Sequence, residues 1–317
     1  MGLCIGRHPW PRWLGAVTFL YLAFACGHPK DDVEPRLGVE DGPLSAKREL
    51  YQSLLPTVSD EDGAVEFDKC DSIHWSALTA AATRPINIRA FVDKAGKLHR
   101  RPARYAECYP AFSKSENSRD AFLMVLAYAV QWEDLALLEQ LFAYGRGHAW
   151  IMGKGALSRT VFTPNMQSLY AQAIQHLGGP SHLERLSPVV WTKDGTGFEA
   201  HLTVMSILTY GKINGGITEK GMEVLEHHWQ REPRNALYAA AYYRYSGVEQ
   251  ARWDAVHALS SNEIWPTDRL PTSAERCEPW LTQRDANGTG WQPCPEEGRV
   301  HSGGDFLLAE AVLSGRF

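Results

Sequence analysis

The sequence lacks the short motifs by which many metal, nucleotide and acyl-transfer enzymes are recognised. It contains no GxSxG, HExxH or GxxxxGK[ST] pattern, and none of its 6 cysteines belongs to a CxxC pair. It also lacks a basic excess, because 32 Lys and Arg residues stand against 37 Asp and Glu residues, for a formal net charge of -5. We therefore expect no nucleic-acid partner, no metal and no cofactor.

The sequence has one long apolar run near its start, and that run is too short for a permanent membrane anchor. It extends from Trp13 to Ala25, whereas a membrane-spanning helix needs about 20 apolar residues. Arg7 and Arg12 precede it and Cys26 follows it. This order predicts an export signal over residues 1–26, similar to that of a bacterial lipoprotein whose lipid is carried by the thiol of Cys26. Secretory cleavage near Ala25, or an uncleaved anchor, is the alternative.

An exported protein of this kind is held in the bacterial periplasm or at the outer membrane by its lipid alone, or is secreted. Four cysteines follow the signal: Cys70, Cys108, Cys277 and Cys294. An even number of cysteines in an oxidising compartment favours disulfides. Three pairings are possible, and we expect Cys70–Cys108 and Cys277–Cys294 because each closes a loop within one region. Four free thiols are the alternative.

The exported part divides into a tether and one domain. Residues 27–43 are charged and contain Pro29, Pro35 and Pro43, which is typical of a tether. Residues 44–317 contain many helix-like segments and few strand-like ones. The length of this part of the chain suits a single α-helical domain.

The domain contains two kinds of predicted helix. Every residue from Ala121 to Val130 is apolar, which is typical of a helix buried on all sides. In Glu133–Tyr144 the leucines share one face, which is typical of a half-exposed helix. The buried kind recurs at Asp71–Ala82, Glu199–Tyr210, Asn235–Tyr245 and Asp305–Leu313, and the half-exposed kind at Gln167–Leu177, Thr218–Trp229 and Val248–Leu259.

This alternation of buried and exposed helices predicts an all-α fold of helical hairpins, each with one member inside. Packed in a ring, such hairpins form a complete or partial (α/α) toroid, and packed in a row they form an α-solenoid. The sequence has no fixed repeat period, which favours the toroid. Ile86–Val92 and Lys97–Arg100, on either side of a turn, predict one small β-hairpin.

Several of the apolar segments begin with polar or ionisable residues. If the inner helices run parallel, these starts meet at one end of the ring and line a cup. Three carboxylates there are the catalytic candidates: Asp71, Asp120 and Asp305. Six further residues are candidates for substrate binding: Arg119, Trp75, Tyr109, Trp150, His201 and Asn235. The alternative is that each polar residue only caps its own helix.

A cup of this composition resembles that of the (α/α)-toroid glycoside hydrolases and polysaccharide lyases. The resemblance concerns the architecture of about Asp71 to Leu313 and no diagnostic motif. It implies either a pair of carboxylates that cleave a glycosidic bond, or a His or Tyr base with Arg or Asn neutralising a uronate. The expected function is cleavage of a cell-wall or extracellular polysaccharide. A non-enzymatic envelope lipoprotein that binds a glycan, peptide or protein in a helical concavity is the alternative, and a purely structural lipoprotein is a third.

Overall fold

The computed structural model describes residues 42–61, 63–65, 72–83, 86–102, 117–155, 159–182, 187–195, 198–272 and 300–317. Several predictions lie outside these ranges: the export signal with Cys26, the tether up to residue 41, and four further cysteines, Cys70, Cys108, Cys277 and Cys294. The candidates Asp71 and Tyr109 also lie outside them. Within the described ranges, no helix combines the length and apolar character that crossing a membrane requires.

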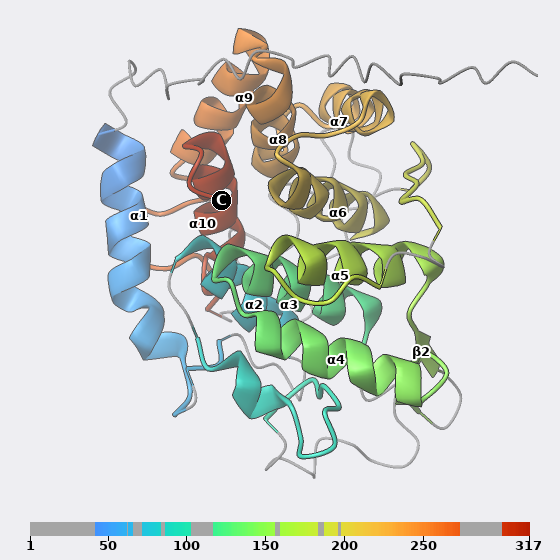
Figure 1. The fold of residues 1–317 in the computed structure, drawn as a ribbon. Coiled ribbons are helices and arrows are strands. Elements are labelled where there is room, and N and C mark those ends of the chain that lie inside the picture. The colour runs from blue at the N-terminus through green and yellow to red at the C-terminus, as the bar shows by residue number, and fades with distance from the viewer. Residues whose placement is uncertain are drawn as a thin grey trace, which may run out of the picture. The chain divides into compact units, whose positions relative to one another are not determined.

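The described chain is mostly helical, as the sequence predicts, with one small antiparallel sheet (Figure 1). The helices are α1 (Gly42–Leu54), α2 (Ile73–Ala82), α3 (Arg119–Gln131), α4 (Leu135–Gly147), α5 (Pro164–His176), α6 (Phe198–Asn214), α7 (Glu219–Arg231), α8 (Ala236–Ser246), α9 (Glu249–Ser260) and α10 (Gly304–Leu313). Two short 3-10 helices cover Leu55–Val58 and Ile88–Phe91. The strands are β1 (Ile151–Lys154) and β2 (Arg159–Val161).

The two predicted kinds of helix are both present. All of α2 is buried, and so are Asp120–Val130 of α3, the first seven residues of α8 and nearly all of α10. In contrast, α4, α7 and α9 each bury one stripe of residues and expose the rest. Side chains of Asp134, Thr163, Thr218 and Asn235 accept backbone N–H groups at the starts of α4, α5, α7 and α8, which stabilises those ends.

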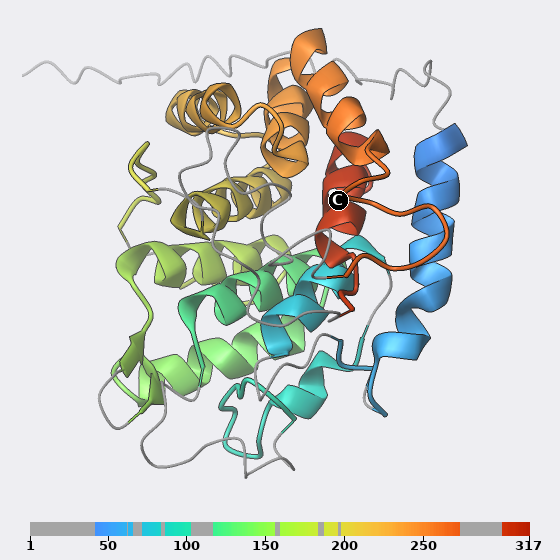
Figure 2. The ribbon, with the colours of Figure 1, turned by 180° about the vertical axis from the view of Figure 1, so that it is seen from behind.

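The buried helices pack against one another in succession. Helix α2 contacts α3 and α10, α3 contacts α6, α6 contacts α8, and α8 contacts α10. The half-exposed helices lie against them: α4 on α3, α7 on α6 and α8, and α9 on α8 and α10. Figure 1 shows α4, α5, α6 and α7 in order from bottom to top, and Figure 2 shows α2 and α3 from the other side. These helices therefore lie next to one another in the interior of the described chain.

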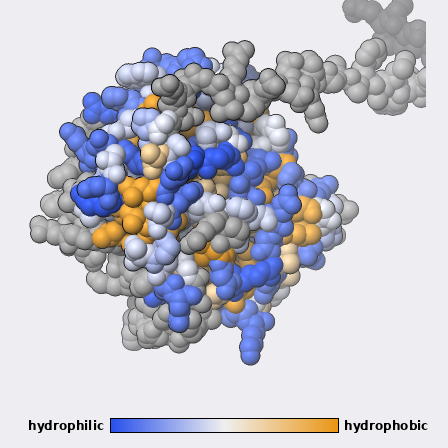
Figure 3. Space-filling model, turned by 90° about the vertical axis from the view of Figure 1, so that its left-hand side faces the viewer, coloured by the Kyte–Doolittle hydropathy of each residue, from blue (hydrophilic) through white to orange (hydrophobic). Residues whose placement is uncertain are grey.

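Helix α1 was not predicted, and it packs along α9 and α10. It buries Leu44, Lys47 and Tyr51 in that contact. The Tyr51 ring meets the edge of Phe306, and its hydroxyl donates to the carbonyl of Pro266 at 3.0 Å. On the face of the molecule that carries α1, hydrophobic areas are small and hydrophilic areas separate them (Figure 3).

The small sheet does not form where the sequence predicts it. In the predicted hairpin the only ladder contact is a single antiparallel bridge between Val92 and Leu98, and Ile88–Phe91 winds into a 3-10 helix. The Asp93 carboxylate accepts the N–H groups of Ala95 and Lys97, which closes a tight turn without extending a ladder. The two-stranded sheet forms instead from β1 and β2, directly after α4.

Candidate functional site

Three ionisable side chains from three different helices meet inside the domain. His74, Asp120 and His201 occur within the first four residues of α2, α3 and α6, respectively. An acidic residue is favourable in a first helical turn because it faces the positive end of the helix dipole. Histidine gains nothing from that position, so helix stability does not explain the two imidazoles.

The geometry of this cluster centres on Asp120. Its Oδ2 lies 4.0 Å from Nδ1 of His74, which is too long for a hydrogen bond but within ion-pair range. Among the described residues Asp120 has no other polar partner, although only 8% of the residue is exposed. Nearly buried carboxylates are normally hydrogen-bonded, so a carboxylate in this state is a candidate for contact with a ligand.

Burial sets the protonation of the second histidine. Burial and, to a smaller extent, the electrostatic effect of nearby His74 lower the pKa of His201 to about 3. His201 is only 1% exposed. Its imidazole is therefore neutral at physiological pH. It can donate and accept hydrogen bonds but does not take up a proton at that pH.

The cluster has an aromatic wall formed by Trp75. Trp75 is buried, and its ring centroid lies 4.1 Å from that of His74. Of the predicted site residues, the structure thus brings together Asp120, His201 and Trp75 through His74.

Other predicted site residues lie elsewhere or serve their own helices. Arg119 is exposed and makes no ion pair with Asp120 in the described contacts. Asn235 accepts the N–H of Tyr238 at 3.4 Å and so caps α8, which is the alternative reading for that residue. Asp305 accepts the N–H of Phe306 at 3.0 Å in the first turn of α10.

The start of α10 is displaced from the cluster along α2. Ser302, just before α10, has its hydroxyl 3.4 Å from that of Thr79. Thr79 follows His74 by five residues, which is about 7 Å along a helix axis. The catalytic candidates Asp120 and Asp305 therefore belong to helix starts that meet α2 at different levels.

Trp150 packs inward at the end of α4. Its ring lies against Gly145 and meets Phe142 edge to face at a centroid distance of 5.0 Å. Ala149 and Trp150 both have positive φ, 51° and 63°. A bulky residue in that region is strained and is held there by the surrounding packing. Trp150 therefore supports the turn that leads into β1.

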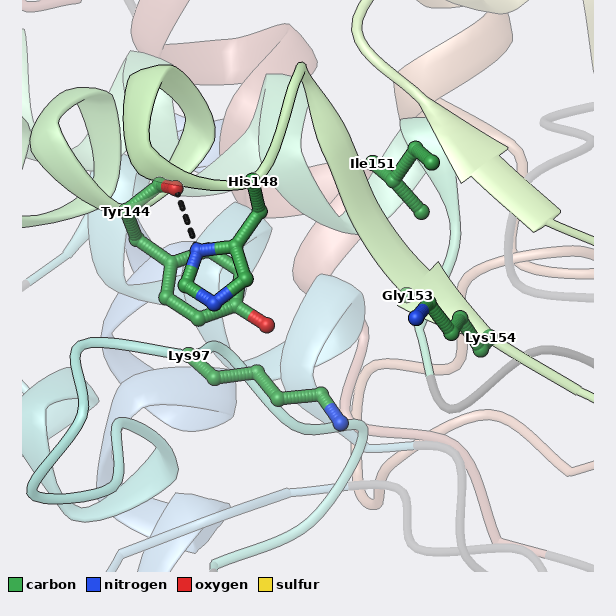
Figure 4. A pocket seen from close by; sticks show the side chains of 6 residues that line it. All are labelled: Lys97, Tyr144, His148, Ile151, Gly153 and Lys154. Atoms are coloured by element: carbon green, nitrogen blue, oxygen red, sulfur yellow. Dashed lines mark hydrogen bonds between the residues drawn. The ribbon is translucent and has the colours of Figure 1, made fainter.

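A pocket of about 310 Å³ opens beside that turn. Figure 4 shows the rings of Tyr144 and His148 stacked at one side of it, Lys97 passing close to them, and β1 with Lys154 at the other side. The Tyr144 and His148 centroids are 4.0 Å apart, and His148 Nδ1 donates to the carbonyl of Tyr144 at 2.8 Å. Two lysines and an imidazole give this pocket a basic lining.

Sequence reasoning did not select His74 or the basic pocket. His74 stands next to Trp75 in a buried helix, and a histidine there is a signal that could have added it to the candidates. Lys97 is about 50 residues from His148 and Lys154 in the sequence, so only the folded chain brings it beside them.

No group of three His, Cys, Asp or Glu side chains in the described ranges, this cluster included, has a metal-binding arrangement. Comparison with known proteins gives no relative, since no family model, curated protein or solved structure matches the chain. The function of this chain must therefore be inferred from the geometry of these sites.

Proposed function

We propose that this chain is an exported, lipid-anchored enzyme that cleaves an envelope polysaccharide, with His74, Asp120 and His201 at its active site. The observation that carries this proposal is the nearly buried Asp120 carboxylate, whose one described partner is an imidazole 4.0 Å away. The order of charged, apolar and cysteine residues at the start of the sequence supports export and attachment at Cys26.

The proposal includes a toroidal arrangement of the inner helices. The contacts of α2 with α3, α3 with α6, α6 with α8, α8 with α10 and α10 with α2 form a closed circuit, which suits a ring of five inner helices. The half-exposed α4, α7 and α9 each cover members of that circuit. A ring of this kind would place the starts of α2, α3 and α6 together, as the cluster requires.

The chemistry favours β-elimination over hydrolysis by paired carboxylates. Asp120 faces an imidazole, so it can orient the His74 ring and stabilise the imidazolium that forms when the ring accepts a proton. His74 would remove the proton on C5, next to the carboxylate of a uronate. The electron pair of that C–H bond would form the C4–C5 double bond as the glycosidic C4–O bond breaks, and the His74 imidazolium would return the proton to the departing oxygen. Neutral His201 would hydrogen-bond the substrate or His74, and Trp75 would support the His74 ring.

Asp120 replacement tests this assignment. Wild-type protein and Asp120→Asn would be incubated with a panel of uronate-containing polysaccharides, and the unsaturated product would be followed by its ultraviolet absorbance. Loss of the carboxylate that orients the His74 base and stabilises its imidazolium should lower turnover by roughly 100- to 10,000-fold. The matched control is Glu249→Gln, which removes a first-turn carboxylate from outer helix α9 where the side chain is 77% exposed. Full activity in Asp120→Asn, or no cleavage of any panel member by the wild type, would remove the enzyme proposal.

A second function, binding of an anionic glycan without cleavage, is favoured by the basic pocket of Lys97, His148 and Lys154. In that case Lys97→Gln with Lys154→Gln weakens glycan binding, and Asp120→Asn leaves it unchanged. Equilibrium binding measured on the same polysaccharide panel separates the two functions.

A further inference from the structure

A second pocket, of about 330 Å³, lies where the start of α1 meets the end of α9 and the segment that follows it. Its lining comprises Pro43, Leu44, Ala46, Lys47, Ser260, Asn262 and Thr267. Leu44 and Lys47 are buried, whereas the other five are exposed. The buried pair therefore forms the floor of the pocket, and the exposed residues form a rim open to solvent.

The floor of this pocket holds a cation, Lys47, that has no carboxylate partner among the described residues. Lys47 is 4% exposed. Its Nζ donates to the carbonyl of Leu259 at 3.1 Å and to Oδ1 of Asn262 at 3.3 Å, and it lies 5.9 Å from the centre of the Phe306 ring. These partners are neutral, and no acidic side chain of the described chain lies within ion-pair distance of Lys47. A buried ammonium without a counter-charge is costly, and an incoming anion would offset that cost.

The neighbouring charges do not supply the missing partner. Arg48 follows Lys47 on α1, and its guanidinium donates to Glu310 of α10 at 3.1 Å. Arg316 also pairs with Glu310. The acid at this contact is thus held by two arginines, and burial alone lowers the pKa of Lys47 to about 8. The amine is still mainly charged at neutral pH.

The rim supplies hydrogen-bond donors of the kind a carboxylate accepts. In the described structure the hydroxyls of Ser260 and Thr267 and the amide nitrogen of Asn262 have no hydrogen-bond partner. Asn262 turns its oxygen toward Lys47, so its nitrogen is directed away from the amine. Pro43, Leu44 and Ala46 complete the lining with apolar surface.

We infer that this pocket binds a small monocarboxylate with a short apolar chain, whose carboxylate pairs with Lys47 and whose chain lies against Pro43, Leu44 and Ala46. The pocket volume leaves ample room for a small organic acid, and the one cation in its floor, which has no acidic partner among the described residues, suits a single negative charge. This site is separate from the His74, Asp120 and His201 cluster and does not depend on the polysaccharide proposal.

Butyrate, with butyramide as its uncharged counterpart, tests the inference by calorimetry or ligand-observed NMR on the full chain. We expect saturable butyrate binding at pH 7, in the millimolar range or tighter, and butyramide binding at least tenfold weaker, because one charge-assisted contact is worth about 1.5 kcal/mol or more. Since the amine loses its proton above a pKa of about 8, butyrate affinity should fall about thirtyfold between pH 7 and pH 9.5. Equal affinity for the two probes, or no saturable binding, would overturn the inference.

Two variants locate the binding. Lys47→Met keeps most of the length of the side chain and removes the charge, so butyrate should bind no better than butyramide. Ser260→Phe changes an exposed rim residue and fills the mouth, so it should weaken butyrate binding at least tenfold while the fold, followed by circular dichroism, is unchanged. Unchanged butyrate affinity in Ser260→Phe would show that the probe binds elsewhere.

Discussion

Two buried polar regions of this molecule differ in the groups that surround their ionisable side chains. Where α2, α3 and α6 begin, the Asp120 carboxylate faces the His74 imidazole, and burial keeps the nearby His201 imidazole neutral. Where α1 meets α9, the contacts of the Lys47 ammonium within the described part of the chain are with two neutral oxygen atoms and an aromatic ring. Among the described residues, Asp120 in the first region and Lys47 in the second each have fewer charged or hydrogen-bonding partners than a purely structural ionic group normally has.

A neighbouring residue shows that the fold can supply such a partner. Arg48 follows Lys47 in the sequence, and its guanidinium donates a hydrogen bond to the nearly buried Glu310 carboxylate. Adjacent cations on one helix thus have different environments, one paired and one unpaired. Glu310 can be understood as the counter-charge that Arg48 needs when α1 packs on α10. Within the ranges that the structure describes, no such structural role accounts for a buried ammonium at Lys47.

The largest expected effect is acid destabilisation through neutral buried histidines. The pKa of His201 is lowered to about 3, and burial lowers that of His228 on α7 to about 4. The unfolded chain binds protons on both below about pH 6.5, and the folded chain does not until much lower pH. The free energy of unfolding is therefore highest above pH 6.5 and decreases as the pH is lowered. Between pH 7.5 and pH 5 we expect a loss of about 4 kcal/mol in the free energy of unfolding, measured by urea titration.

His228→Phe tests the contribution of one of these histidines. His228 Nε2 has no hydrogen-bond partner in the described structure, so an apolar ring can replace the imidazole. The variant should lose only about half as much stability over the same pH interval. His257→Phe, at an exposed position on α9, is the control and should behave as the wild type does. An identical pH dependence in His228→Phe and wild type would contradict the assignment.

The second largest effect is expected from removing the carboxylate partner of Arg48, which gives Arg48 an environment more like that of Lys47. Glu310→Gln removes the nearly buried carboxylate that Arg48 and Arg316 share. Because both arginines are partly exposed, we expect a loss of about 2 to 3 kcal/mol, below the range for a fully buried pair. Glu49→Gln removes the other carboxylate near Arg48, 3.7 Å away and 70% exposed, and should cost less than about 0.5 kcal/mol. Similar losses in the two variants, compared by denaturant midpoints, would show that burial does not distinguish these pairs.

The smallest effect is alkaline stabilisation through Lys47. Its folded pKa of about 8 lies below the ordinary lysine value of 10.5, so protonation favours the unfolded chain and the penalty fades as pH rises. From pH 7 to pH 9.5 this group should add about 2 kcal/mol to the wild-type stability relative to Lys47→Met. Lys220→Met, at an exposed lysine of α7, is the matched control and should track the wild type. Parallel stability curves for Lys47→Met and wild type would mean that Lys47 is not penalised by burial.

The sequence predicted best those elements whose patterns are local. The unbroken apolar run from Ala121 to Val130 predicted the buried α3, and the one-sided leucines predicted α4. Helix α1 was missed because its buried face includes Lys47, a residue type that marks exposed positions in most helices. The β1–β2 sheet was missed because it is short and its first strand contains Gly153.

The candidate site could be predicted only in part. Asp120 and His201 were identifiable as polar residues at the starts of apolar helices, but the same criterion selected Asn235, which caps α8. Helix capping and site formation use the same residue types at the same positions, so the sequence alone does not separate them. His74 became a candidate only when its 4.0 Å approach to Asp120 was known.

The meeting of three helix starts also has a consequence for folding. His74, Asp120 and His201 are far apart in the chain, whereas α8 and α9 follow one another directly and pack together. Contacts between distant segments form only after large loops close, and hairpins of neighbouring helices do not wait for that step. The cluster should therefore be among the last parts of the molecule to assemble, and newly made chains will acquire most of their helices before they acquire this site.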